Sequence, residues 1–130
     1  MLKEGILNPA LLELLARFRH TNSLVIADRG FPFWPQVPTI DLALTENIPT
    51  VRQVLALVAR HCTLGAAWMA EEVRSHNPAP VIDEYQRLLG GVKIQFEPHY
   101  TKFKPRVPAA IGLVRTGDAT PFGNIILESA

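Results

Sequence analysis

The sequence predicts a single layered α/β domain in which a largely parallel central sheet is flanked by helices. Short apolar segments alternate along the chain with amphipathic segments of helical spacing, which is the pattern of a parallel sheet with crossover helices. The composition, 48% hydrophobic and 19% charged, supplies enough apolar surface for a buried core. A length of 130 residues is close to the commonest domain size, so we expect one domain over residues 1–130.

The first helix is expected to begin after Asn8, whose side chain can cap it, with Pro9 at the first helical position. Its apolar stripe has the i, i+3, i+4, i+7 spacing of a buried face and consists of Leu11, Leu14, Leu15 and Phe18. The stripe stops near Arg19. His20 is therefore expected at or just beyond the C-terminal end of this helix.

Residues 23–27 are apolar and partly β-branched, which predicts a short strand with Asp28 at its carboxyl end. Residues 31–38 contain three prolines, which remove backbone donors, and are expected to form an ordered surface loop. Residues 40–44 are expected to form another short strand. A second amphipathic helix then opens at Pro49-Thr50, with an inner face made of Val51, Val54, Leu55, Val58 and Cys62.

The second half of the chain continues the alternation. Residues 65–70 are a strand candidate, and residues 81–89 have helical spacing and end at Gly90-Gly91. Residues 92–96 predict the next strand, and His99 follows it in a stretch whose prolines leave room for only a short helix. Two closing strands are expected. They are residues 110–114 and 124–127, with a turn-rich segment between them.

The charge and the cysteine content argue against several kinds of partner and cellular location. The formal net charge is +1 and no block of one sign is present, so neither nucleic acid nor a membrane surface is an expected partner. Cys62 is the only cysteine, which rules out an internal disulfide and favours a cytoplasmic location. No apolar run reaches the roughly 18 to 20 residues of a membrane span, and the N-terminus lacks the pattern of a signal peptide, so we expect a soluble, full-length protein.

Asp28 and His99 each follow a predicted strand, and ligands of open α/β sheets bind outside the carboxyl ends of the strands. His20 lies only a turn upstream of the first strand, so we expect a cleft that holds two imidazoles and a carboxylate. Such a set can transfer protons near neutral pH. Structural roles stay open, because a histidine can interact with a helix C-terminus and an aspartate can close a turn.

Other chemistries lack their motifs. There is no phosphate-binding Gly-rich loop, no dinucleotide fingerprint and no serine-hydrolase elbow. Histidine and cysteine spacings typical of metal sites are also missing, so no metal is expected, although His20, Asp28 and His99 would be potential ligands if they converged. His61 is expected on a helix surface and His76 in a loop, and neither is assigned a role.

Several segments, taken together and in order, are specific to one family. They are His20-Thr21-Asn22, Ala27-Asp28-Arg29-Gly30-Phe31-Pro32, Ile40-Asp41-Leu42-Ala43-Leu44-Thr45, Ala70-Glu71-Glu72, His76-Asn77-Pro78, His99 and Thr116-Gly117-Asp118-Ala119-Thr120-Pro121-Phe122-Gly123-Asn124. With them the chain resembles the ribose pyranase and fucose mutarotase family over nearly its whole length. The segment 40–45 is more similar to the ribose branch, while Phe31-Pro32 also occurs in the fucose branch.

The resemblance implies an isomerase of free monosaccharide ring forms, with ribose as the preferred sugar and no cofactor. It also implies a homo-oligomer, typically a decamer of stacked pentamers, with each site at a subunit boundary. His20 would be the catalytic proton donor. The sugar would be bound by positions that match Asp28, His99, Phe122, Gly123 and Asn124.

Two positions depart from the family pattern. Phe122 stands where members usually carry tyrosine, so a hydroxyl is lost, and Asn22 stands where they usually carry aspartate. An asparagine accepts a hydrogen bond but does not stabilise a protonated imidazole as a carboxylate does. These changes keep three alternatives open: a non-catalytic sugar-binding or regulatory member, a fucose-type mutarotase, and a purely structural ring-forming protein.

Overall fold

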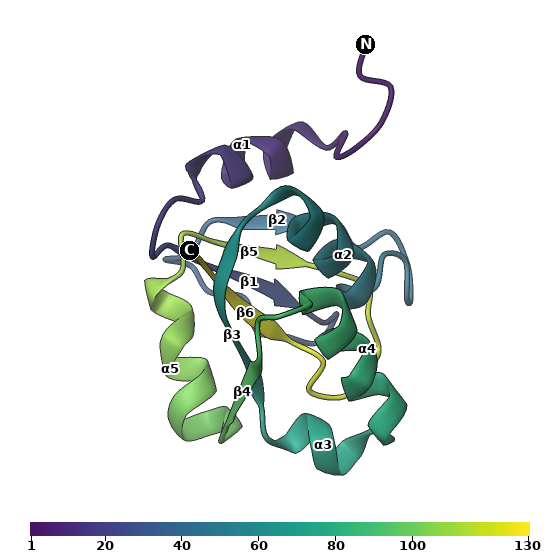
Figure 1. The fold of residues 1–130 in the computed structure, drawn as a ribbon, viewed down its shortest axis with the longest axis vertical. Coiled ribbons are helices and arrows are strands. Elements are labelled where there is room, and N and C mark those ends of the chain that lie inside the picture. The colour runs from purple at the N-terminus through teal and green to yellow at the C-terminus, as the bar shows by residue number, and fades with distance from the viewer.

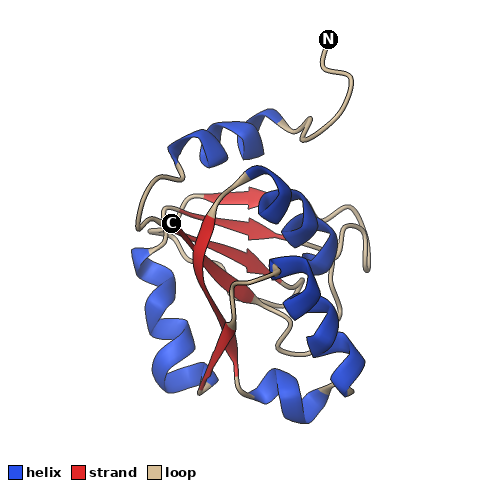
Figure 2. Ribbon diagram, in the orientation of Figure 1, coloured by secondary structure: helices blue, strands red, loops and turns tan.

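The computed structural model describes residues 1–130 as one six-stranded sheet with helices on both faces (Figures 1 and 2). The strand order across the sheet is β2-β5-β1-β6-β3-β4. The strands are β1 (Ser23–Ala27), β2 (Thr39–Asp41), β3 (Leu64–Ala70), β4 (Ile94–Glu97), β5 (Gly112–Arg115) and β6 (Ile125–Ser129). The α-helices are α1 (Pro9–Arg17), α2 (Val51–His61), α3 (Glu72–His76), α4 (Ala79–Leu89) and α5 (Lys104–Arg106).

The sheet is largely parallel, as the sequence predicts, but its fourth strand in spatial order is reversed. β6 runs antiparallel to both of its neighbours, β1 and β3, whereas the β2/β5, β5/β1 and β3/β4 pairs are parallel. This reversal has a direct consequence for the functional residues. The segment that enters β6 lies at the same edge of the sheet as the segments that leave the parallel strands.

Local side-chain chemistry fixes the starts of two helices at the predicted places. The Asn8 side chain accepts the backbone N–H of Leu11 at 2.9 Å and caps α1. At α2, Thr50 and Gln53 form a capping box, in which each side chain accepts the other residue's backbone N–H, at 3.1 and 2.9 Å. Both helix starts are therefore confirmed.

The core lies on the two faces of the sheet, because alternate residues of a strand point to opposite sides. Leu24 and Ile26 of β1 face the buried side chains of α1, α2 and α4. Val25 and Ala27 face the other way, toward the proline-rich loop and the helical segment that contains α5 (Figure 1). None of the helices combines the length and the apolar character needed to cross a bilayer.

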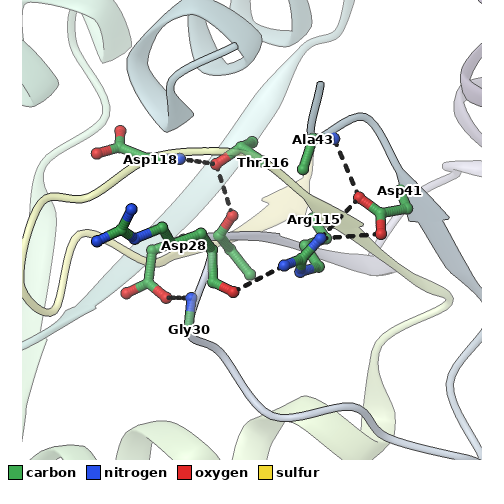
Figure 3. A network of polar contacts seen from close by, with 9 residues as sticks. Asp28, Gly30, Asp41, Ala43, Arg115, Thr116 and Asp118 are labelled. Atoms are coloured by element: carbon green, nitrogen blue, oxygen red, sulfur yellow. Dashed lines mark hydrogen bonds and ion pairs between the residues drawn. The ribbon is translucent and has the colours of Figure 1, made fainter. Parts of the chain in front are cut away.

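Two short elements differ from the expectations. The strand expected over residues 40–44 ends at Asp41, because the Asp41 carboxylate accepts the backbone N–H of Ala43 at 3.0 Å and turns the chain out of the sheet (Figure 3). The segment after β3 forms α3, so the expectation that His76 lies in a loop is wrong. His76 is the last residue of this helix.

The helical segment after β4 is longer than the prolines suggest. It begins as a π-helix over His99–Phe103, continues as α5 and ends as a 3₁₀-helix over Val107–Ala109. Pro105 and Pro108 stand in the first turns of the last two elements.

Candidate functional site

Four of the predicted site residues line one cavity of about 270 Å³ at the edge of the sheet where β1 and β4 end and β6 begins. They are Asp28, His99, Phe122 and Asn124. Such a volume lies at the small end of the usual range of ligand pockets, so the cavity suits a small molecule. The predicted meeting of Asp28 and His99 is therefore confirmed.

Asp28 is anchored in the mouth of this cavity by its hydrogen bonds. Its backbone N–H donates to the Asn124 side-chain oxygen at 2.6 Å, and the Asn124 amide donates back to the Asp28 carboxylate at 3.1 Å. The N–H of Gly30 donates to the other carboxylate oxygen at 2.9 Å (Figure 3). Burial raises the pKa of Asp28 above its ordinary value, while the bonds from Asn124 and Gly30 act in the opposite direction.

The segment before β6 has a constrained backbone that places Phe122 and Asn124. Phe122 adopts a left-handed conformation, with φ of 55°, which is uncommon for a bulky residue and typical of functional constraint. The Gly123 carbonyl accepts the hydroxyl of buried Tyr85 at 2.9 Å. A Cβ on Gly123 would lie 3.0 Å from that hydroxyl, so a glycine permits the close approach. Gly123 itself does not line the cavity.

His99 supplies a buried imidazole to the cavity and is 6% exposed. Its ring stacks on Phe103 at a centroid distance of 5.7 Å and meets Tyr100 and Phe122 edge-on at 4.9 and 5.1 Å. The Nδ1 atom has no hydrogen-bond partner in the protein. A buried polar atom without a partner is costly, which is itself a mark of functional constraint at His99.

The π-helix brings two further residues to the cavity that the sequence did not indicate. Its wide turn places Lys104 five residues after His99 at the wall of the cavity, next to Tyr100. The Lys104 ammonium lies over the Tyr100 ring, 5.0 Å from its centroid. A one-turn π-helix has no sequence signature of its own, although such turns are frequent at functional sites.

His20 does not reach this cavity within one chain, so the expected cleft of His20, Asp28 and His99 is wrong for a single subunit. His20 precedes β1 and Asp28 follows it, and the five residues of β1 extend over roughly 13 Å at about 3.3 Å per residue. The His20 side chain is exposed at the opposite edge of the sheet. It lies in a turn where the Asn22 side-chain oxygen accepts the backbone N–H of Arg19 at 2.9 Å.

The electrostatics of His99 suit an uncharged ligand. Burial lowers the pKa of His99, the positive charge of Lys104 lowers it further, and Glu72 acts in the opposite direction. The imidazole is therefore neutral at neutral pH, where one nitrogen accepts a hydrogen bond and the other donates one. No group of three or more His, Cys, Asp or Glu side chains is arranged to bind a metal ion.

The lowered pKa makes a testable prediction. As the pH falls, His99 should stay neutral to a lower pH than an ordinary histidine, whose pKa is about 6.5. The unfolded chain then binds a proton that the native chain does not, so stability should fall as the pH drops below about 6.5 through the native pKa. Long-range ¹H–¹⁵N NMR of the imidazoles measures this titration, with the urea-unfolded protein as reference. A native pKa at or above the unfolded value would contradict this account of the cavity.

Known proteins resemble this chain over its full length. A model of the RbsD / FucU transport protein family matches residues 1–130. The D-ribose pyranase of Geobacillus kaustophilus is 41% identical over 129 residues, which cover 99% of this chain and 93% of that protein. The D-ribose pyranase of an Escherichia coli strain is 32% identical over 134 residues, which cover 98% of this chain and 96% of that protein.

Solved structures agree with the fold. The structure of Bacillus subtilis RbsD complexed with D-ribose has a TM-score of 0.92 and 32% identity, covering 100% of this chain and 98% of that one. The fucose mutarotase of Streptococcus pneumoniae in complex with L-fucose shares the fold, with a TM-score of 0.80 at 19% identity over 95% of this chain and 92% of that one. With a family match over all its residues and a relative that is 41% identical over nearly the whole chain, the chain belongs to the RbsD / FucU transport protein family.

Proposed function

We propose that this protein is an isomerase that interconverts the pyranose and furanose forms, and the anomers, of free D-ribose. The observation that carries the proposal is one small cavity lined by Asp28, Asn124 and the buried imidazole of His99. A small cavity with a few convergent polar groups suits a small polyhydroxylated ligand. The names of the relatives, D-ribose pyranase, and the D-ribose in the complex with Bacillus subtilis RbsD support ribose as that ligand.

The chemistry requires one acid and one base. Ring opening removes the proton of the anomeric hydroxyl and delivers a proton to the ring oxygen as its bond to the anomeric carbon breaks, which leaves an open-chain aldehyde. Closure by a different hydroxyl, or on the other face of the aldehyde, gives the other ring form or anomer. General acid-base catalysis of this kind accelerates a step by about 10² to 10⁴.

In this proposal each residue has a distinct role. Asp28 and Asn124 bind sugar hydroxyls through the remaining hydrogen-bonding capacity of their side chains, and the ring of Phe122 packs against the sugar. The backbone of Gly123 holds this segment in place. His99 is a second polar contact and proton partner, because a neutral imidazole can accept a proton at neutral pH. No residue of the mechanism requires a cofactor.

His20 acts as the proton donor from a neighbouring subunit. Within one chain it lies at the opposite edge of the sheet from Asp28, and its exposed side chain is free to reach into another subunit. An arrangement in which one edge of each subunit meets the opposite edge of the next is heterologous, and it forms a ring when the rotation between subunits closes. The position of His20 supports a homo-oligomer with each site at a subunit boundary, and the family resemblance supports a decamer of stacked pentamers. The single cysteine supports a cytoplasmic location.

Exchange NMR on D-ribose tests the proposed function. Magnetisation transfer between the pyranose and furanose signals should speed up in proportion to protein concentration. L-fucose and other free sugars form the comparison panel. Saturable ribose binding with no faster exchange would favour a non-catalytic sugar-binding or regulatory protein, and a preference for fucose would favour a fucose-type mutarotase. If the protein neither binds ribose nor accelerates exchange, the remaining alternative is a structural ring-forming protein.

Replacing Phe122 by tyrosine should raise the catalytic efficiency, kcat/KM, for ribose about tenfold, which is the value of one added hydrogen bond in a site of this kind. The ring lies between His99 and His76, with centroids 5.1 and 4.8 Å away, so a hydroxyl added to it can contact the bound sugar. Phe96→Tyr is the matched control, since that ring lies under Arg74 instead. An unchanged efficiency in Phe122→Tyr would mean that the site works without this hydroxyl.

A further inference from the structure

The short helix α3 contacts both halves of the cavity, although none of its residues lines it. Its first residue, Glu72, accepts the backbone N–H of His99, with its two carboxylate oxygens at 3.0 and 3.2 Å. At its other end, the His76 ring lies 4.8 Å from the ring of Phe122. The next residue, Asn77, donates from its side-chain amide to the carbonyl of Pro121 at 2.9 Å. The helix therefore connects the π-helix to the segment that enters β6.

The contact from Glu72 reaches His99, the buried imidazole of the cavity. The N–H of His99 is at the start of the π-helix and has no acceptor within it, so it needs a partner from elsewhere in the fold. A carboxylate that accepts such an N–H makes a charge-assisted bond, which is stronger than a neutral one. It also places negative charge at the positive end of the helical segment.

The contact between Glu72 and His99 follows from the order and direction of the strands. β3 and β4 are parallel neighbours, so the segments that leave them, α3 and the π-helix, begin side by side at the same edge of the sheet. The N–H of Glu71 donates to the carbonyl of Glu97 at 2.7 Å and extends this pairing by one step. Glu72 is the next residue. Its side chain is therefore the first one beyond the sheet that can reach the backbone of His99.

We propose that Glu72 is a positioning residue of the sugar site, which sets the place of the His99 imidazole relative to Phe122 and Asn124. This inference rests on the proposed function for its effect on ring exchange, and on the geometry alone for its effect on His99. The negative charge of Glu72 also raises the pKa of His99, against the larger effects of burial and of Lys104. Removing that charge should therefore lower the pKa of His99 further.

Glu71 offers a matched control in the same helical turn. Its carboxylate pairs with exposed Arg74 at 3.2 Å and has no contact with His99. Replacing Glu71 or Glu72 by glutamine removes the same charge from neighbouring positions. Only the replacement of Glu72 alters the hydrogen bond to the backbone N–H of His99.

The experiment compares Glu72→Gln and Glu72→Ala with Glu71→Gln and Glu71→Ala in the full-length protein. We expect Glu72→Ala to lower kcat/KM for ribose ring exchange by about 10- to 100-fold, the value of a hydrogen bond to a charged group. Glu72→Gln should recover part of this loss, because its amide oxygen still accepts the His99 N–H. Both Glu72 variants should lower the pKa of His99 in an NMR titration, and both Glu71 variants should leave it unchanged.

The outcomes separate this inference from the proposed function. Equal kcat/KM and equal His99 pKa in the Glu72 and Glu71 variants would overturn the positioning role. Wild-type protein that does not accelerate exchange would overturn the proposed function instead, while the titration of His99 would still report on Glu72. If Glu72→Ala does not fold, the near-isosteric Glu72→Gln decides the question through the titration and the exchange rate.

Discussion

Replacing His20 by alanine is expected to slow protein-catalysed exchange of ribose ring forms by about 10² to 10⁴, the contribution of one general acid-base group. The proton donor is lost, while the cavity of Asp28, His99 and Asn124 keeps its hydrogen bonds, since His20 lies at the other edge of the sheet. We therefore expect the effect in kcat, with ribose binding retained. Exchange NMR and calorimetric titration with ribose measure the two quantities on the same preparation.

His61→Ala is the control for this change. His61, like His20, is an exposed histidine at or near the C-terminal end of a helix, but it belongs to α2, and its ring nitrogen bonds to the Leu57 carbonyl of its own helix at 2.7 Å. Its loss should leave the exchange rate unchanged. An undiminished rate in His20→Ala would remove this histidine from the mechanism.

Replacing Asp28 by asparagine is expected to weaken ribose binding by about 10- to 100-fold, because a hydrogen bond to a charged acceptor is worth about 1.5 to 3 kcal/mol. The new amide keeps the size of the side chain, but it places donor hydrogens where the Asn124 amide and the Gly30 N–H already donate. Weaker binding should appear as a higher KM and a higher dissociation constant for ribose. Phe122 and His99 should remain in place.

Asp41→Asn is the matched control, because Asp41 also ends a strand at this edge of the sheet. Its carboxylate pairs with Arg115 at 3.0 Å, outside the cavity (Figure 3). This variant should bind ribose as the wild type does. Equal affinities in Asp28→Asn and the wild type would show that the Asp28 carboxylate does not hold the sugar.

The sequence predicts the elements whose starts depend on local chemistry. Asn8 and Thr50 predict the starts of α1 and α2, because their side chains accept backbone N–H groups within the next three residues. α3 has no such signal. It has five residues, no side-chain cap at Glu71 and no apolar stripe, and it forms because Val73 is buried against the core.

The site is predictable only in part, for reasons of topology. Asp28 and His99 follow parallel strands, so their meeting at one edge follows from the order of the elements. The approach of Asn124 depends on the reversal of β6, which is a tertiary pairing with β1 and β3 and leaves no trace in the local pattern. In the sequence, only the family resemblance indicated Phe122, Gly123 and Asn124.

For His20 the sequence suggested a contact that a single chain does not make. His20 and Asp28 are eight positions apart in the sequence, which suggests proximity, but the five residues of β1 between them are fully extended. A strand separates its ends by about 3.3 Å per residue, more than twice the 1.5 Å per residue of a helix. The two residues can therefore share a site only across a boundary between subunits.

Subunit mixing tests that central claim most directly. His20→Ala and Asp28→Asn chains, each with a different affinity tag, are co-expressed, and the hybrid oligomers are isolated on both tags. If each site takes His20 from one subunit and Asp28 from the next, about a quarter of the sites in a random hybrid contain neither substitution. Measured as kcat/KM, the activity of the hybrid should then be about a quarter of the wild-type value, although each variant alone should keep at most about a tenth of it. A hybrid no more active than its two parents would contradict the shared site.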